Sequence, residues 1–465
     1  MNDADAITEA AVSEGPGFRR ALGTFDATMV VIGGIVGAGI FINPYIVAQR
    51  LPTDALVLAA WIAGGAIALA GAFAFAELGS LFPQAGGPYV YLRRAYHPMV
   101  GFLYGWALLF MIVGGGIAAI AITFAVYALR VTGSTAAATP LAIAAIVVVS
   151  AINYIGVKPG SRVLNVFVVL KVAALAALIV VGTLLPHAER ATATAAPTTG
   201  LLPIAFGAAL IPIMFSYGGW QNANYVAEEI RDPERSLPRA LIGGTAAVVL
   251  LYALVNVIYL RALGHDGLAA TTTPAADAAA RVLGAGGDRA ISLAIAVSTF
   301  GFLHLSVLAT TRVYWARAAD GIFFRGMARL HPRFRSPSLA IAVQSGWAIA
   351  LALTGSYAQL VDYVVFADWV FFGLTVGAVF IFRRRLPLAT RSPTSYAAPG
   401  YPVVPLLFVA AAVVIVISVV WSNPARSALG TVLLATGIPA YLFWSRRRQR
   451  TERESAADNA HDVVV

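Results

Sequence analysis

Four glycines between Gly33 and Phe41 are the residues with the clearest chemical potential. The stretch reads Gly-Gly-Ile-Val-Gly-Ala-Gly-Ile-Phe and lies inside the first hydrophobic segment, which predicts a helix interrupted within a membrane. Unpaired backbone in hydrocarbon is costly, so it survives there only where it faces protein, water or a ligand. The half-helices beside such a break present positive N-terminal ends to an anion and free carbonyls to a cation. The stretch therefore predicts a site for a small charged molecule such as a zwitterion.

A second glycine-rich interruption reads Phe215-Ser216-Tyr217-Gly218-Gly219-Trp220 and lies about five hydrophobic segments later. Two interrupted helices in matching places predict two inverted repeats, with the substrate where the broken helices meet. The alternative is that the glycines only allow close helix packing, as small residues do in many membrane proteins. The density of both clusters, each in a segment that continues past the interruption, favours broken helices.

Lys171 is the third informative feature. It lies near the centre of the fifth hydrophobic segment and is one of two lysines in a chain that otherwise uses arginine. A lysine at the centre of a membrane helix is expensive and usually functional, whereas one near a helix end reaches the interface. We therefore expect Lys171 to have a coupling or gating role, with a purely structural buried amine as the alternative.

The elements that must position these residues are membrane helices. Hydrophobic residues make up 59% and charged residues 12% of the 465 residues, and the mean hydropathy is +0.79, which excludes a soluble globular protein. Segments of about 20 apolar residues are needed to cross a bilayer. About twelve are predicted, near residues 25–49, 55–78, 98–129, 138–156, 163–186, 201–228, 239–260, 289–315, 338–356, 359–382, 402–421 and 427–445.

The distribution of arginine and lysine predicts the orientation of these helices. With the N-terminus in the cytoplasm, the cytoplasmic connections hold 24 of the 32 basic residues, the opposite side holds 7, and Lys171 lies within a span. The net charge of +10 therefore reports topology and contact with anionic lipid, and no nucleic-acid partner is expected. We predict a multi-pass protein of the cytoplasmic membrane with both termini in the cytoplasm and no cleaved signal peptide.

Several classes of function lack the residues they need. The chain has no cysteine, which excludes disulfides, thiolate metal sites and a disulfide-linked subunit. It has no Walker-type phosphate loop and no His-Glu-x-x-His motif, so ATP-driven transport and metal-dependent hydrolysis are not expected. We expect no cofactor, no metal and no enzymatic activity, because no pair of nucleophile and base can be proposed.

Taken together, several motifs resemble the amino acid-polyamine-organocation superfamily, specifically its L-type amino acid transporter-like branch. Besides the first glycine cluster, they are Pro83-Gln84-Ala85-Gly86-Gly87-Pro88-Tyr89-Val90-Tyr91-Leu92, Tyr217 to Trp220 followed by Glu228-Glu229-Ile230-Arg231-Asp232-Pro233, Arg312-Val313-Tyr314 with Asp320-Gly321, and Pro399-Gly400-Tyr401-Pro402. The resemblance implies an all-α, leucine-transporter-like fold of twelve helices, with 5+5 inverted repeats and helices 1 and 6 broken. It also implies sodium-independent movement of amino acids by exchange or facilitated transport.

The resemblance also implies roles for individual residues. The amides around Val36, Gly37, Ala38 and Gly39 would bind the substrate carboxylate, and the carbonyls near Ile32, Phe215 and Gly218 its ammonium. The ring of Phe215 would close over the substrate, while Ser216, Tyr217, Trp220 and Asn222 are weaker candidates for lining the side-chain subsite. Lys171 matches a lysine that stands where sodium sits in sodium-coupled relatives, and would bridge the first break to Ser298 and Thr299 of the eighth span.

Other polar or small residues within the spans have simpler interpretations. Glu77 is expected to pair with a nearby arginine, and Glu228 and Glu229 to form a cytoplasmic gate or loop network. Asp368 and His304 would tune substrate or proton response or, slightly favoured, bond to a neighbouring helix. The glycines of the third span, Gly114, Gly115 and Gly116, would widen the substrate site or serve packing.

The predicted organisation is a cytoplasmic tail over 1–24, a first repeat over 25–186, a second repeat over 201–385, a peripheral helix pair over 402–445 and a cytoplasmic tail over 446–465. The expected substrates are small or branched neutral L-amino acids, moved by alternating access. Proton-coupled symport and transport of cationic amino acids or amines remain alternatives, and an amino acid sensor with little flux is a distant one. The sequence leaves open which amino acid is carried, exchange versus proton coupling, the direction of flux and the oligomeric state.

Overall fold

The computed structural model describes residues 20–84, 86–155, 161–184, 202–319, 323–334 and 336–446. The motif residues Ala85, Asp320 and Gly321, and most of the two predicted tails, lie outside this part of the chain. In the described part, regular structure is helical, and the only β-type pairing is an isolated bridge between Leu22 and Ile230. The protein is an all-α, multi-pass membrane protein, as predicted.

The helices of the first half include a broken first span, α2 (Thr24–Ile35) and α3 (Gly39–Arg50). They continue with α4 (Asp54–Leu81), α5 (Pro88–Ala95), α6 (Pro98–Ala107), a π-helical segment (Leu108–Val113), α7 (Gly114–Thr132), α8 (Ala138–Tyr154) and α9 (Ser161–Leu184).

The second half begins with the other broken span, α10 (Leu202–Tyr217) and α11 (Asn222–Tyr225), followed by a 3₁₀ turn (Ala227–Glu229). Next come α12 (Pro233–Ala270), α13 (Pro274–Leu283), α14 (Ala285–Ala319), a 3₁₀ turn (Arg325–Ala328), α15 (Ser338–Thr354), α16 (Tyr357–Arg385) and a 3₁₀ turn (Leu388–Thr390). The last helices are α17 (Val403–Ser422) and α18 (Pro424–Ala435).

The predicted spans agree with these helices. Within the described residues, nine helical segments are long and apolar enough to cross a membrane, the last of them running from Pro424 to Arg446. Three shorter apolar helices, α8, α10 and α15, correspond to the remaining predicted spans. Two helices were not predicted as such. The short α5 begins at Pro88, directly after Gly86 and Gly87, and α13 lies in the connection between the seventh and eighth spans.

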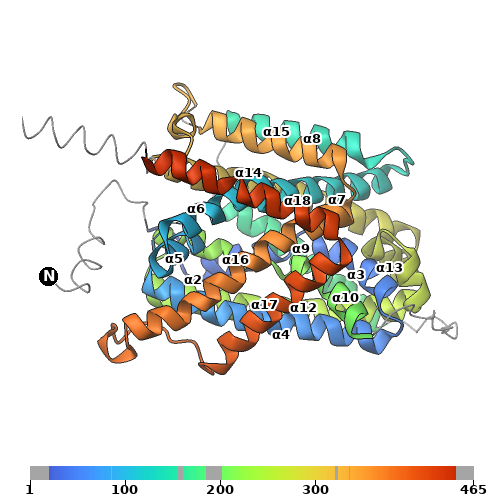
Figure 1. The fold of residues 1–465 in the computed structure, drawn as a ribbon. Coiled ribbons are helices and arrows are strands. Elements are labelled where there is room, and N and C mark those ends of the chain that lie inside the picture. The colour runs from blue at the N-terminus through green and yellow to red at the C-terminus, as the bar shows by residue number, and fades with distance from the viewer. Residues whose placement is uncertain are drawn as a thin grey trace, which may run out of the picture.

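The two broken spans run antiparallel to each other overall. Among their contacts, Gly34 lies against Gly219, Asn43 bonds to Ser216, and Arg50 bonds to the carbonyl of Ala208, while beyond the helix ends Leu22 and Ile230 form a short parallel bridge. As the residue number rises along the first span it falls along the second, which is the relation expected of inverted repeats. Figure 1 shows α8 and α15 side by side at one edge of the molecule, away from α2, α3 and α10. Most residues of α3 and α10 are buried.

A buried ion cluster fastens the connection between α16 and α17 to α4. The Glu77 side chain is 1% exposed and accepts bonds from Arg383 (2.9 and 2.7 Å), from Arg391 (2.8 Å) and from the amide of Ala398 (2.8 Å). The expected pairing of Glu77 with a nearby arginine is confirmed. Because two guanidinium groups share one carboxylate, removing its charge leaves both without their counter-ion.

We expect Glu77→Gln to lower the free energy of unfolding by about 2 kcal/mol or more, because hydrogen bonds between charged groups are replaced by weaker ones. Thermal unfolding of the purified protein in detergent measures this change. Glu234→Gln is the matched control, since Glu234 bonds to Thr394 of the same connection from a more exposed position. An equal loss of stability in both variants would contradict the importance of the buried cluster.

Candidate functional site

The first helix break leaves amides without partners at the start of α3. The amides of Val36 and Gly37 are already engaged, bonding to the carbonyls of Ile32 (2.8 Å) and Ile35 (2.7 Å). No side chain caps α3 at Ala38. Within the described chain, the amides of Ala38, Gly39 and Ile40 have no backbone acceptor. Three adjacent donors at a helix N-terminus form a site suited to a carboxylate.

Only glycine fits where the two breaks touch. A Cβ atom built on Gly219 would lie 2.2 Å from the carbonyl oxygen of Gly34, and one built on Gly34 would lie 2.6 Å from that of Gly219. Gly219 also has a φ of +115°, which side-chain-bearing residues rarely adopt. The glycine clusters therefore allow two unwound backbones to cross in direct contact.

The second break extends from Gly218 to Gln221, between α10 and α11. The amide of Gly218 bonds back to Met214 (3.0 Å), and that of Gly219 is capped by the side chain of Gln221 (2.9 Å). Phe215 borders the cavity described below and packs edge-on against Tyr357 at 6.3 Å between ring centroids. The ring thus lies at the junction of α10 and α16, beside the break.

Three of the predicted subsite side chains pack away from the cavity. The Ser216 hydroxyl donates to the carbonyl of Pro212 (2.8 Å) and accepts from Asn43 (2.7 Å), which fastens α10 to α3. Tyr217 packs against Trp61 and Tyr252, and Trp220 against Phe75 and Phe372. All three are buried. Their contacts with neighbouring helices hold the second break in place.

A cavity of about 460 Å³ lies where the breaks meet. Of the predicted site residues, Gly37, Ala38, Gly39, Phe215, Gly218, Lys171 and Ser298 line it, as does the weaker candidate Asn222. Ile32, Val36, Ser216, Tyr217, Trp220 and Thr299 are not among its lining residues. The cavity continues past the breaks to Leu22 and Asp26 at the start of the first span. It therefore joins the helix breaks to one end of the bundle.

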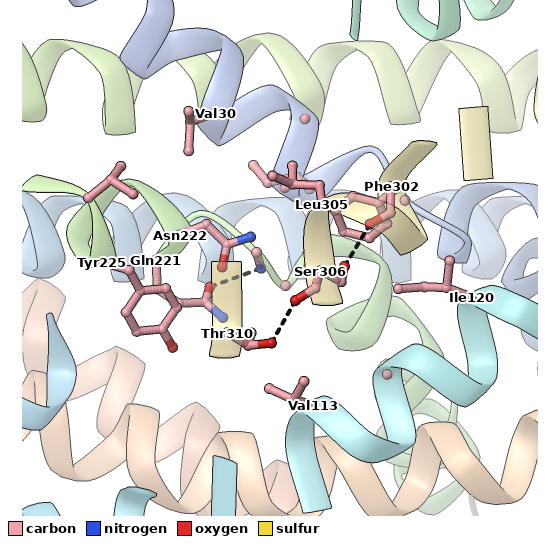
Figure 2. A pocket seen from close by; sticks show the side chains of 18 of the residues that line it. Val30, Val113, Ile120, Gln221, Asn222, Tyr225, Phe302, Leu305, Ser306 and Thr310 are labelled. Carbon is pink, nitrogen blue, oxygen red and sulfur yellow. Dashed lines mark hydrogen bonds between the residues drawn. The ribbon is translucent and has the colours of Figure 1, made fainter. Parts of the chain in front are cut away.

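Several other lining residues were not predicted from the sequence. Figure 2 shows two of them, Gln221 and Tyr225, beside the weaker candidate Asn222 on one side of the cavity, with Leu305, Ser306 and Thr310 of α14 next to them. The hydroxyls of Ser306 and Thr310 bond to carbonyls of their own helix, at 2.8 Å to Phe302 and 2.6 Å to Ser306, and the Thr310 hydroxyl also lies 2.8 Å from Gln344 Oε1 of α15. Hydroxyl-bearing residues are common in membrane helices, so their spacing alone does not indicate a cavity.

Lys171 binds the first break directly. Its Nζ donates to the carbonyls of Gly33 (2.8 Å) and Val36 (2.5 Å), and its side chain is buried. On the α14 side its contact is with the ring of Phe302, whose centroid lies 5.2 Å from Nζ. The Thr299 hydroxyl instead bonds to its own helix, at the carbonyls of Ile295 and Ala296. The ammonium thus satisfies two carbonyls that the break frees.

The remaining candidates divide into packing and lining residues. His304 faces α8, where its Nδ1 lies 3.0 Å from Asn153 Nδ2, which confirms the expected bond to a neighbouring helix. Cβ atoms on Gly114 and Gly115 would meet Trp347 and Val364 at 2.6 and 2.7 Å, so these glycines serve packing. Gly116 lines the cavity and has no atom within 4 Å of a Cβ position. Packing therefore accounts for Gly114 and Gly115, whereas Gly116 leaves room in the cavity.

Two antiparallel broken helices, with unpaired amides and an internal cavity where they meet, define a secondary transporter of the broken-helix class. The chain belongs to the amino acid permease family, whose profile matches residues 22–444. The membrane carrier implied by the motifs and the family assignment therefore agree.

The chain is similar to characterised members of this family along nearly its whole length. It is 30% identical to the serine/threonine exchanger SteT of Bacillus subtilis over 440 residues, covering 94% of this chain and 99% of that protein. It is 29% identical to the rat large neutral amino acids transporter small subunit 2, covering 95% and 85% of the two chains. It is 28% identical to the mouse Asc-type amino acid transporter 1, covering 95% and 84%. These relatives are amino acid transporters, as the predicted branch implies.

Proposed function

We propose that this protein exchanges small or branched neutral L-amino acids across the cytoplasmic membrane, without sodium, by alternating access. The observation that carries the proposal is the group of unpaired amides at Ala38, Gly39 and Ile40, of which Ala38 and Gly39 line the cavity between the helix breaks. The serine/threonine exchanger SteT supports exchange and a small side chain. The rat large neutral amino acids transporter small subunit 2 supports a neutral substrate, and the mouse Asc-type amino acid transporter 1 supports an amino acid substrate.

In this proposal the amino acid is held by backbone at both charged ends. Its carboxylate accepts from the three unpaired amides, where the dipole of α3 adds favourable potential. Its ammonium donates to the carbonyls of Gly218 and Phe215 at the second break. The Phe215 ring then covers the bound molecule and excludes water, offering its face to the cation. Selectivity among side chains is left to the walls of the cavity.

Lys171 supplies the fixed positive charge at the first break. Its ammonium donates to the carbonyls of Gly33, in the last turn of α2, and of Val36, in the break, which are backbone groups of the kind that coordinate a cation in sodium-coupled carriers. A covalently attached cation removes the requirement for sodium. Proton coupling is the second candidate mechanism, because a lysine buried in this position changes its protonation readily.

The orientation of the protein in the membrane follows from the distribution of its arginines. Arg383, Arg384 and Arg385 end α16 beside the Glu77 cluster, and the start of α2 lies at the same end of the bundle. We assign this arginine-rich end to the cytoplasm. The cavity, which reaches Asp26, then faces the cytoplasm, and the molecule is in an inward-facing state. The protein works as a carrier without a disulfide-linked subunit, since it has no cysteine.

Gly116 sets the room for the substrate side chain. Because a Cβ there meets no atom within 4 Å and the residue lines the cavity, Gly116→Val fills space that a substrate would use. We expect uptake of leucine to fall about tenfold while uptake of alanine or serine changes much less. Uptake by Gly346→Val is the control, since Gly346 also has open space and is not among the cavity-lining residues. Equal losses for leucine and alanine in Gly116→Val would contradict this role.

The proposal is tested by uptake of a panel of radiolabelled amino acids into proteoliposomes, with sodium replaced by choline. We expect small and branched neutral amino acids to be transported, and analogues without the carboxylate or without the ammonium to be excluded. Strict dependence on sodium, or transport of amines that lack a carboxylate, would overturn it. Binding of amino acids without uptake would favour the sensor alternative.

A further inference from the structure

Among the side chains that the structure describes, the cavity has more negative than positive groups. The charged ones that line it are four carboxylates and one ammonium, namely Asp26, Glu228, Glu229, Asp368 and Lys171. The ammonium is used by the first break, where it holds two backbone carbonyls. The electrostatic potential of the carboxylates therefore favours the binding of a cation in the cavity.

Asp368 differs from the other three carboxylates in that none of the described residues bonds to it. Asp26 accepts from the amide of Gly23 (3.1 Å) and from Asn165 (2.9 Å). Glu228 and Glu229 also interact with other groups of the protein. Within the part of the chain that the structure describes, no hydrogen bond or ion pair reaches Asp368. An ionised carboxylate away from bulk water is costly until it acquires a counter-charge.

Packing contacts of α16 fix the level of Asp368 along the cavity. One turn before it, Val364 lies against Gly115 of α7. About one turn after it, Phe371 and Phe372 pack against Tyr104 of α6 and Trp220 of the second break. Asp368 therefore lies level with the second break, beside the predicted place of the substrate and away from the cavity mouth at Asp26.

We propose that Asp368 is the counter-charge for a second amino group on the substrate, so that the cavity takes cationic amino acids such as ornithine and lysine besides neutral ones. The inference rests on the proposed function, because the helix breaks must hold the α-carboxylate and α-ammonium while the side chain extends to Asp368. The side-chain ammonium supplies the charge that the carboxylate lacks, and the pair forms charge-assisted hydrogen bonds in a place largely shielded from water.

The test compares matched substrates that differ chiefly in the side-chain ammonium. Norvaline is paired with ornithine and norleucine with lysine, as competitors of labelled neutral amino acid uptake in proteoliposomes and as ligands that raise the thermal stability of the purified protein. In the wild type we expect ornithine and lysine to compete at least as well as their neutral partners. In Asp368→Asn their affinity should fall about tenfold or more, with norvaline and norleucine little changed.

Asp362→Asn is the matched control. Asp362 lies on the same helix but bonds to Asn423 (2.6 Å) and is not among the cavity-lining residues, so the ratio of lysine to norleucine affinity should stay at the wild-type value. Asp368→Glu keeps the charge and should retain binding of the cationic partners. If Asp368→Asn does not fold, Asp368→Ser serves as the second neutral variant, and the wild-type pairs remain decisive on their own.

The competition and stability measurements separate failure of the role of Asp368 from failure of the proposed function. Poor competition by ornithine and lysine in the wild type overturns the inference, while stabilisation by norvaline and norleucine leaves the proposed function intact. Loss of pH dependence in Asp368→Asn, with no change toward cationic substrates, also overturns it and assigns the carboxylate to a proton. If no amino acid of either kind stabilises or competes, the proposed function itself fails.

Discussion

Lys171→Ala is expected to reduce amino acid exchange by about a hundredfold or more while the protein still folds and enters the membrane. The ammonium donates to the carbonyls of Gly33 and Val36, so its removal leaves two backbone acceptors without partners inside the bundle. Such groups cost several kcal/mol in a membrane and the break should lose its fixed geometry. Exchange of labelled serine in proteoliposomes, normalised to the amount of folded protein, measures the effect.

Leu170→Ala provides the control for this result. Leu170 precedes Lys171 on α9 but is 55% exposed, on the surface that faces lipid, so its truncation alters the same helix without touching the break. We expect near wild-type exchange in this variant. Exchange by Lys171→Ala at the wild-type rate, with an unchanged response to pH, would remove Lys171 from the mechanism.

Gly219→Ala is expected to abolish transport by separating the two helix breaks. The added Cβ would lie 2.2 Å from the carbonyl oxygen of Gly34, and the backbone φ of +115° is itself unfavourable for alanine. Overpacking of this kind typically costs about 1–3 kcal/mol. Here the carbonyl oxygen belongs to the backbone of the site, and the new Cβ is bonded directly to that backbone. Uptake and thermal unfolding of the same purified sample separate loss of function from loss of fold.

Gly243→Ala is the matched substitution in α12, where no atom lies within 4 Å of the new Cβ. It should leave uptake unchanged and stability unchanged or slightly raised, because alanine favours helix more than glycine does. Normal uptake by Gly219→Ala would show that the two breaks need not be in contact, and would contradict the geometry on which the site rests.

The features that were predictable from sequence are those that have one physical explanation. A dense glycine cluster inside a hydrophobic span has few uses, and the breaks at Gly33 to Gly39 and Phe215 to Trp220 were located within a few residues. A lysine in mid-span needs a partner, and Lys171 has two carbonyls. The twelve spans follow from hydropathy, since hydrocarbon requires long apolar segments.

Side-chain directions around the breaks were not predictable in the same way. Ser216, Tyr217 and Trp220 adjoin the second break, yet their side chains turn toward α3, α4, α12 and α16, because a helix places successive side chains on different faces. The π-helical segment before Gly114 could not be predicted from the composition of the sequence. In the structure, the carbonyl of Phe110 in this segment accepts a hydrogen bond from Trp347 (2.6 Å). Such details depend on tertiary packing.

The α13 helix was missed for a related reason. It is a short helix in a connection, too brief and too polar to register as a span. Its place is set by Arg130 at the end of α7, whose guanidinium bonds to Asp277 at 2.5 Å and lies 3.7 Å from Asp288. These partners are far apart in sequence, so neither local propensity nor spacing indicates the contact.

Exchange of amino acids through the site between the two helix breaks can be measured as uptake of labelled serine into proteoliposomes. The vesicles are either empty or preloaded with unlabelled serine, and each kind is tested with and without an acidic exterior. We predict rapid uptake only into preloaded vesicles, at a rate insensitive to the proton gradient. Uptake into empty vesicles driven by the acidic exterior would contradict exchange and establish proton symport instead.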